Sequence, residues 1–441
     1  MRITTFFYSL YKVFHAALLN IAGLHSNDRK KNIAAASLLS TTFRIPEKDR
    51  FSLLKTLLYL LRSVVKTPVK KITLPSSDKL IFDISSSDRD LRIKYTKYFT
   101  GAGAIDYTDY NSLNVYPSFF YKIVSILVFS LILPPFTLVA IFIPKEKRAA
   151  AALLIEEVIV LSNLLWVCRI SNVKITYHFS IYEVFSNVFA EALLSEDIKV
   201  VKIPSEVPLA IWNKKILASV LVICNAYQLE EIKVYKETML FDATEFWGPE
   251  LILDIKDLYK KDDDSKPEFT LGFYSTGGWL RKMLGHIDQG MKIEEQEMKV
   301  KHALGQYALK KGISIGVFLH PREKKEEYFE HTRQHYEQVF KGVNYAFMAF
   351  DIANNKMFNK VDLAVAFNTT IMYERLYCGF KCLFVPLELG NFPLVNSPIK
   401  NICALTEEEI EQKIEAFTAM DKKVYFRDNK LTAYAGLNDL V

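Results

Sequence analysis

Cysteine is scarce in this chain and widely scattered. Its 441 residues include five cysteines, at positions 168, 224, 378, 382 and 403. They form no CxxC pair and no cluster with histidine, which argues against both a disulfide framework and a zinc site. We therefore expect a protein of a reducing compartment.

Other signatures of protein classes are missing as well. The N-terminus carries one early Arg, but Lys12 and His15 interrupt its apolar run and no small-residue cleavage site follows, so we expect no signal peptide. No aromatic and basic recognition motif accompanies the basic residues, so nucleic acid is not an expected partner. No DxD triplet stands at the end of a predicted strand, and we interpret Asp262–Asp264 as solvated charge in a linker. We expect no metal site.

Basic residues are concentrated at the N-terminus. Up to Ile72, Lys and Arg far outnumber the acidic residues, in a protein whose total excess is +6. Within this region, residues 51–66 place leucines on one helical stripe with Lys55, Arg62 and Lys66 at its edges or opposite. The pattern is typical of a helix lying on an anionic bilayer surface. An ordinary core-facing helix with a basic solvated face is the alternative.

A long apolar segment follows at residues 118–144. It is uncharged from Ile123 to Ile143, long enough to cross a bilayer, and contains Pro134 and Pro135 at its centre. Adjacent prolines remove backbone donors, and Lys122 and Lys145 place positive charge at both flanks. We therefore favour a re-entrant hairpin, with a single span or a buried pair of helices as alternatives.

Strands and helices alternate in the rest of the chain. In the first such region, Val173–Phe179 and Ile198–Pro204 are predicted strands, and the helix between them is capped by Ser180 with Glu183 at the capping-box position. A charged linker is expected at 261–268. The predicted strands of the second region are Phe269–Tyr274, Ile313–Leu319, Val361–Phe367 and Lys381–Val385. This alternation predicts an α/β fold with parallel sheets.

Three turns of the second region carry residues suited to phosphate. Gly277 and Gly278 follow the first strand and allow close backbone approach, and His320 follows the second. His320 precedes Pro321, which we expect to start the next helix. A plain strand end followed by a helix-initiating proline is the alternative.

The third turn reads Asn368, Thr369, Thr370 and opens a predicted helix. Its hydroxyl and N–H groups suit an anion, although the same residues are good helix caps. Glu374 lies one turn into that helix, where it could reach a ribose or sugar hydroxyl. Because all three turns follow parallel strands, we expect them to share one edge of a sheet.

The second region resembles the donor-binding half of GT-B glycosyltransferases. Its His-Pro pair followed by hydroxyl residues is similar, more narrowly, to motifs of bacterial sialyltransferases, polysialyltransferases and capsule Kdo transferases, and of CDP-glycerol polymerases. In those families, the His and the hydroxyl pair bind the phosphates of a cytidine donor. The resemblance implies that His320, Thr369 and Thr370 hold the donor phosphate. This chain has Asn-Thr-Thr where those families favour Ser pairs, so UDP- and GDP-sugars stay open beside a CMP-linked donor.

The resemblance implies a GT-B-like enzyme with two Rossmann-like domains facing a cleft and no cofactor beyond the donor substrate. The expected reaction is metal-independent transfer of a sugar to a lipid-linked or polysaccharide acceptor at the cytoplasmic face of a bacterial inner membrane. Glu183 and His178 are candidates for the base, with helix capping and core packing as their structural alternatives, and His320 is a catalytic candidate at the leaving phosphate. No acidic-acidic-Gly base motif stands in the N-terminal half.

The predicted organisation has five parts: a membrane-associating region at 1–150, an acceptor domain at 151–260, the linker at 261–268, a donor domain at 269–405 and a C-terminal helix and tail at 406–441. Two alternatives to glycosyl transfer stay open. One is a CDP-glycerol-type glycerophosphotransferase, and the other is a non-catalytic scaffold of a polysaccharide assembly complex.

Overall fold

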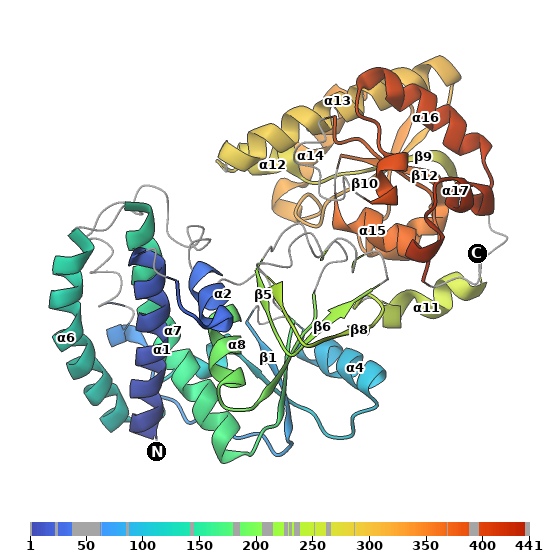
Figure 1. Ribbon diagram of the computed structural model, residues 1–441. Coiled ribbons are helices and arrows are strands. Elements are labelled where there is room, and N and C mark those ends of the chain that lie inside the picture. The colour runs from blue at the N-terminus through green and yellow to red at the C-terminus, as the bar shows by residue number, and fades with distance from the viewer. Residues whose placement is uncertain are drawn as a thin grey trace. The chain divides into compact units, whose positions relative to one another are not determined.

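The computed structural model divides the chain into two compact units (Figure 1). The first comprises Met1–Ser205 with later segments up to Trp247, and the second is mainly Gly248–Val441. The structure describes residues 2–22, 25–37, 62, 64–84, 88–141, 145–179, 186–204, 215–224, 228, 232, 239–250, 252–261, 266–285, 287–367, 369–387 and 397–436. Most of the predicted amphipathic stripe at 51–66 therefore lies outside the described residues, which include only 62 and 64–66 of it. Glu183, Asn368 and part of the predicted linker also lie outside them.

The first unit is built on a six-stranded parallel sheet in the order β2-β1-β3-β4-β6-β8. These strands are β1 Lys79–Asp83, β2 Asp106–Asp109, β3 Ile175–His178, β4 Lys199–Lys202, β6 Val220–Ile223 and β8 Ala243–Phe246. A separate parallel pair joins β5 Ile216–Leu217 to β7 Met239–Leu240. Strands β1 and β2 were not predicted from the sequence, and they lie within the region assigned to membrane association.

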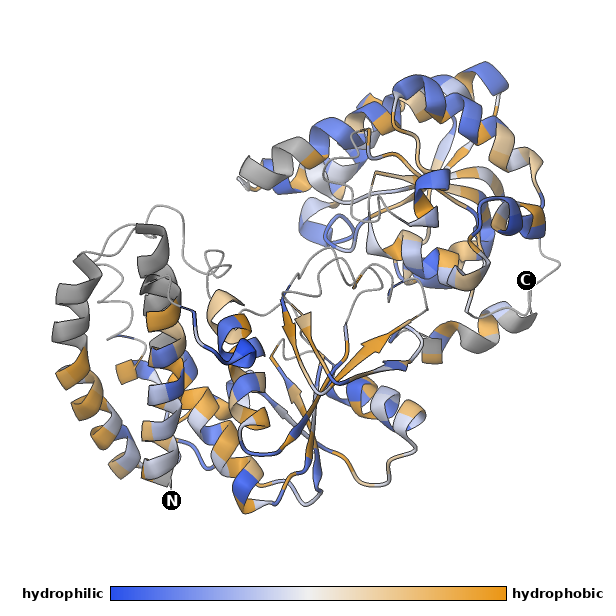
Figure 2. Cartoon of the chain, viewed as in Figure 1, coloured by the Kyte–Doolittle hydropathy of each residue, from blue (hydrophilic) through white to orange (hydrophobic). Residues whose placement is uncertain are grey.

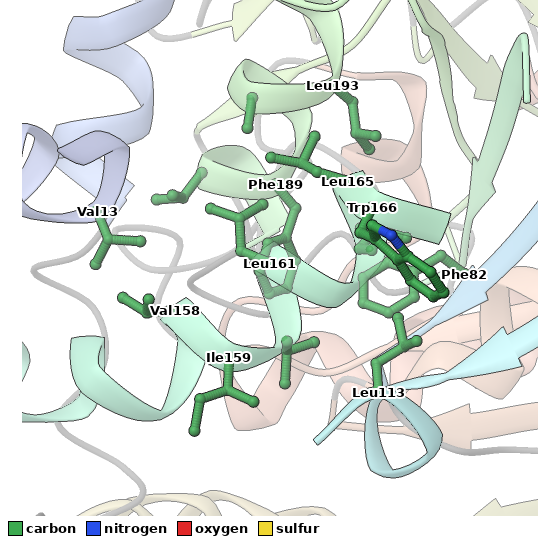
Figure 3. Close-up of a cluster of buried hydrophobic side chains, with 14 of the residues drawn as sticks. Val13, Phe82, Leu113, Val158, Ile159, Leu161, Leu165, Trp166, Phe189 and Leu193 are labelled. Carbon is green, nitrogen blue, oxygen red and sulfur yellow. The ribbon is translucent and has the colours of Figure 1, made fainter. Parts of the chain in front are cut away.

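Helices of this unit come mostly from the N-terminal half of the chain. They are α1 Arg2–Ala22, α2 Arg29–Ser37, α4 Arg89–Thr100, α5 Tyr110–Leu113, α6 Phe119–Ile141, α7 Lys145–Ile170 and α8 Ser186–Leu194. Figure 3 shows their core, to which α1 contributes Val13, α7 contributes Leu161 and α8 contributes Phe189. Phe189 meets Phe82 of β1 edge to face at 5.4 Å between ring centroids. Burial of each such side chain contributes about 1.5–3 kcal/mol, so the N-terminal helices are part of the folded core.

The apolar segment 118–144 does not form the predicted hairpin. From Phe119 to Ile141 it is one helix, α6, which includes both prolines. Proline has a φ close to the helical value, so a helix can continue past it at the cost of lost backbone hydrogen bonds. In the described part of the chain, no helix is both long and apolar enough to span a bilayer.

The second unit is built on a five-stranded sheet in the order β11-β10-β9-β12-β13, with every pair parallel. Its strands are β9 Phe269–Tyr274, β10 Ile315–Phe318, β11 Tyr345–Phe347, β12 Val361–Ala366 and β13 Cys382–Phe384. The four strands predicted for this region are confirmed, each within two residues at either end. They are Val-, Leu- and Phe-rich and buried, as expected of a parallel sheet covered on both faces.

Seven helices and three 3₁₀ segments of this unit are described. They are α11 Ile252–Lys261, α12 Gly278–Met283, α13 Ile287–Lys311, α14 Glu326–Val339, α15 Thr370–Tyr377, α16 Glu407–Ala419, α17 Lys422–Asp428, η2 Asn354–Lys360, η4 Pro398–Ile402 and η5 Thr432–Tyr434. Pro321 does not start a helix, contrary to our prediction. The Glu323 N–H donates to the His320 carbonyl at 2.8 Å, so Pro321 is the second residue of a turn, where its fixed φ fits.

Chain order identifies the ligand-binding edge of this sheet. The chain begins at the central strand β9, adds β10 and β11 on one side, and then crosses to add β12 and β13 on the other. The order therefore reverses between β9 and β12. In open parallel sheets, ligands bind outside the carboxyl ends of the strands at such a switch point.

Candidate functional site

The residues after β9, β10 and β12 share the carboxyl edge at the switch point. Gly277 and Gly278 follow β9, His320 follows β10, and Thr369 precedes α15 after β12. Because β9 lies between β10 and β12, its glycine turn has the other two turns as neighbours. The structure thus brings together the three turns that were singled out in the sequence.

Local packing explains why glycine is found at both positions. Gly277 has a φ of +68°, and a Cβ there would lie 3.2 Å from Cγ of His320. A Cβ on Gly278 would lie 3.1 Å from the backbone nitrogen of Glu294. The pair therefore lets the turn pack against the His320 ring on one side and α13 on the other.

His320 is held as a neutral imidazole. Its Nδ1 accepts the main-chain N–H of Arg322 at 3.2 Å, so in the neutral ring the proton is on Nε2. Burial, together with the positive charges of Arg281 and Arg322, lowers the pKa of His320 to about 4. At neutral pH, the ring can therefore donate a hydrogen bond through Nε2–H.

Two arginines that were not predicted from the sequence as site residues accompany His320. Arg281 lies in α12, where its N–H donates to the Gly277 carbonyl, and Arg322 lies two residues after His320. Burial and the charge of Arg322 lower the pKa of Arg281. Nε of Arg281 is buried without a hydrogen-bond partner, and among the described residues no acidic side chain forms an ion pair with either arginine. Their short spacing from Gly277 and from His320 is the signal that could have revealed them.

The hydroxyl turn does not act as an ordinary helix cap. Thr369 is the N-cap residue of α15, with extended backbone angles of −145° and 144°, but its side chain makes no capping hydrogen bond. Thr370 begins the helix, and both threonines are partly exposed. Their hydroxyl groups and the first N–H groups of α15 therefore lie at the sheet edge with the capacity to bind an anion.

Arg375 fixes the position of α15. Its fully buried guanidinium donates to the main-chain carbonyls of Phe358, Val361 and Lys381. These bonds tie the helix to the chain on both sides of β12. Glu374, the residue before it, lies one turn into α15 from the threonines.

His178 is a packed residue in the first unit. It ends β3, its ring is completely buried against Phe82, and Nε2 pairs with the Thr176 hydroxyl at 3.0 Å. Burial and the charge of Lys202 lower its pKa to about 3. A fully buried imidazole cannot reach the hydroxyl of a sugar acceptor. The structure therefore favours core packing for His178 over the assignment as a catalytic base. Glu183, the other candidate, lies outside the described residues.

No protein-family model matches this sequence, and no curated protein matches it. Similar solved structures include MurG of Acinetobacter baumannii, at 10% identity over 82% of this chain and 97% of that chain, with a TM-score of 0.43. UDP-GlcNAc 2-epimerase from Neisseria meningitidis, bound to UDP-GlcNAc, matches at 12% identity over 82% and 96%, with a TM-score of 0.45. A mutant O-GlcNAc transferase of Thermobaculum terrenum matches at 10% identity over 97% and 82%, with a TM-score of 0.39. Such values are too low to transfer an activity.

Proposed function

We propose that this chain is a glycosyltransferase that moves a sugar from a nucleotide-sugar to a lipid-linked or polysaccharide acceptor in bacterial surface glycan synthesis. The observation that carries the proposal is the cluster of Arg281, Arg322 and neutral His320 at the switch point of a parallel sheet. In the described residues neither guanidinium forms an ion pair, although the charge of Glu297 acts on Arg281, and such a pair of arginines suits an anionic ligand. The partly exposed hydroxyls of Thr369 and Thr370 add neutral donors at the same edge.

These residues suit the departure of a nucleotide phosphate. When the bond between the sugar carbon and the phosphate oxygen breaks, negative charge grows on that oxygen and the acceptor hydroxyl forms the new bond. Arg281 and Arg322 stabilise the charge, and His320 donates through Nε2–H. A base takes the acceptor proton, and Glu183 stays our candidate for it because His178 is packed. Glu374 is our candidate for contact with a ribose or sugar hydroxyl.

The positive charge of the site indicates which class of nucleotide donor it suits. A CMP-linked sugar carries one negative charge on its phosphate, whereas UDP-, GDP- and CDP-linked compounds carry two on the diphosphate. Two arginines beside a neutral histidine match the second class better. We therefore place diphosphate donors ahead of the CMP-linked donor that the resemblance implies.

We also propose that the protein acts at the cytoplasmic face of the inner membrane. Support comes from exposed apolar side chains on α1 and α6, two helices joined by edge-to-face contact of Phe6 with Phe129 at 5.7 Å. Figure 2 shows apolar colour on much of the part of α6 that is coloured. The exposed residues are Ile3, Phe7, Tyr11 and Leu18 of α1, and Phe119, Phe120, Ile123, Leu127 and Leu131 of α6. Helices α1, α2 and α6 contain no acidic residue, which suits an anionic lipid surface.

A thermal-shift panel of UDP, CDP, GDP and CMP tests the proposed donor site. A nucleotide at 100 times its dissociation constant stabilises the folded state by about 2.7 kcal/mol. We expect a diphosphate to stabilise the wild type, and the variants Arg281→Gln and Arg322→Gln to lose that shift. Arg333→Gln, which removes an exposed arginine of α14, is the matched control. If no nucleotide binds, the proposed function is wrong.

Transfer assays then separate the reaction classes. Release of nucleoside diphosphate from a nucleotide-sugar, with the sugar appearing on the acceptor, supports glycosyl transfer. Turnover of CDP-glycerol with release of CMP would instead indicate the glycerophosphotransferase, which needs the same phosphate contacts. Nucleotide binding without turnover on any acceptor would favour the scaffold.

A further inference from the structure

Two buried carboxylates hold the loops of the proposed phosphate site from behind. Glu297 comes from α13 and Glu323 from the turn after β10, and both are completely buried. Glu297 accepts the main-chain N–H of Thr276 through Oε1, and Glu323 accepts that of His320 through Oε2 at 2.7 Å. Each carboxylate therefore fixes the backbone of one loop beside the switch point.

Buried side chains of α12, α13 and α14 surround the two carboxylates. The Trp279 indole N–H and, at 3.4 Å, the Tyr336 hydroxyl donate to Oε1 of Glu323. Nζ of Lys301 lies 3.7 Å from Oε2 of Glu297. On its other side, Lys301 meets Nε2 of His335 at 3.1 Å, and burial together with Lys301 lowers the pKa of His335 to about 3. His335 is therefore a neutral acceptor.

Two cations interact with Glu297: Lys301, whose Nζ lies 3.7 Å from its Oε2, and Arg281 of α12. The groups that face Glu323 are Glu297 and Lys301 of α13, Tyr336 of α14 and Ser275 of the β9 turn. Among the groups that face Glu323, Lys301 is the cation that lowers its pKa, and burial outweighs this effect. Burial, followed by the charge of Glu297, raises the pKa of Glu323 to about 7.

The ionised form of Glu323 is the form that can accept hydrogen bonds from both of its N–H partners. As a carboxylate it accepts the N–H of His320 on one oxygen and the N–H of Trp279 on the other. A protonated carboxyl turns one oxygen into a donor that faces an N–H donor. That oxygen keeps only a weaker acceptor capacity, so one of the two bonds is weakened.

We propose that Glu323, supported by Glu297 and Lys301, is a positioning residue whose carboxylate holds the His320 loop in the conformation that binds the donor phosphate. The ligand-binding part of this inference rests on the proposed function, whereas the loop-holding part does not. Glu323 would act from behind the ligand site, where its side chain is shielded from solvent.

Loop holding and folding stability then respond to pH in opposite directions. The folded pKa of Glu323 lies above its ordinary value of 4.5, so the folded state binds the proton more tightly than the unfolded state. The stabilisation is complete below 4.5 and is lost as pH rises through about 7. As Glu323 ionises around pH 7, in contrast, its hydrogen bond to the His320 N–H becomes stronger and fixes the loop. The affinity for the donor should therefore increase as pH rises through this range.

Glu323→Gln tests the proposal, with Glu326→Gln on the exposed face of α14 as the matched control. Hydrogen exchange of the amides in the loops at 275–278 and 319–323 is compared at about pH 6 and about pH 8, after correction for intrinsic exchange. We expect the wild type and Glu326→Gln to be better protected at the higher pH. Glu323→Gln should be unprotected at both, because its amide offers one acceptor to two donors. Equal protection in Glu323→Gln and wild type would overturn the proposal.

Two readouts of the wild type keep the test decisive even if Glu323→Gln fails to fold. The indole resonance of Trp279, identified by Trp279→Phe, should titrate with a midpoint near 7, and a flat response overturns the proposal. The second readout is the affinity for UDP-GlcNAc, whose diphosphate does not titrate in this window. It should fall by up to about tenfold between about pH 8 and about pH 6, the change in the ionised fraction of a group with a pKa near 7. If binding of UDP-GlcNAc does not depend on pH, the proposed link between Glu323 and donor affinity is overturned. If UDP-GlcNAc does not bind at all, the proposed donor class is contradicted. In that case the hydrogen-exchange and indole results still decide whether Glu323 positions the His320 loop.

Discussion

The imidazole of His320 lies directly against the α-carbon of Gly277. A Cβ at position 277 would come within 3.3 Å of three atoms of the His320 side chain. The two residues follow neighbouring parallel strands, β9 and β10, so their contact ties one loop of the proposed site to the other. A change at the glycine should therefore displace the histidine.

Gly277→Ala should lower both stability and nucleotide affinity. A left-handed φ costs an L-residue about 1–2 kcal/mol, and the new methyl group also presses on His320. Gly312→Ala is the matched control, because Gly312 has a φ of +65° with nothing within 4 Å of its Cβ position. Denaturant unfolding should show similar backbone strain in both variants. Calorimetry should show weaker nucleotide binding in Gly277→Ala alone, and equal affinities would contradict the proposed contact.

Substitutions of His320 should separate its two ring nitrogens. His320→Ala should reduce transfer about 100- to 1000-fold, the effect of removing a donor to developing negative charge, with a small change in melting temperature. His320→Gln can restore a donor near the position of Nε2 and should recover part of the rate. His320→Asn can restore only the acceptor for the Arg322 N–H and should recover little.

Transfer measured from about pH 5 to about pH 8 should show no step from His320, since its pKa is lowered to about 4. The neutral ring is the donor throughout this range. If transfer by the wild type fell as an imidazole of ordinary pKa lost its proton, while His320→Gln showed no such fall, imidazolium would be the active form and the assignment of a neutral donor would be wrong.

Thr369→Val should weaken nucleotide binding with little loss of stability, because its side chain makes no capping bond. Thr406→Val is the contrasting variant. The Thr406 hydroxyl accepts the Glu409 N–H at the start of α16, so its loss should cost about 0.5–2 kcal/mol of stability and leave binding unchanged. Thermal unfolding with and without nucleotide measures both effects. A Thr369→Val protein that binds normally would remove this residue from the site.

The double variant Phe7→Glu, Leu127→Glu should release the protein from vesicles that contain anionic lipid. Each change places a carboxylate on the exposed apolar part of α1 or α6, which the proposal presses against the headgroups. Leu309→Glu, at a similarly exposed position of α13, is the control and should leave vesicle binding unchanged. Co-sedimentation measures the partition, and equal binding by all three proteins would contradict the assigned surface.

Local pattern was enough to predict the elements of the second sheet. Short Val-, Leu- and Phe-rich runs bounded by turn residues became β9, β10, β12 and β13, because a strand buried on both faces is continuously apolar in sequence. The same pattern was not sufficient for β1 and β2. Asp106–Asp109 reads Asp-Tyr-Thr-Asp and has no apolar run, and it is a strand because β1 pairs with it.

Sequence also determined which side chains stand at the ends of those strands: Gly277, His320 and Thr369 follow directly from position. Tertiary structure alone decided what these residues meet. Arg281 comes close to His320 because β9 and β10 are neighbours, whereas Arg322 lies in the same turn as His320. Glu297 reaches the Thr276 N–H from a separate helix, α13, while the bond from the His320 N–H to Glu323 is local. Protonation was decided there too. A histidine becomes a neutral donor, and a glutamate titrates near neutrality, only when burial and neighbouring charges act on them together, and those depend on contacts between distant parts of the chain.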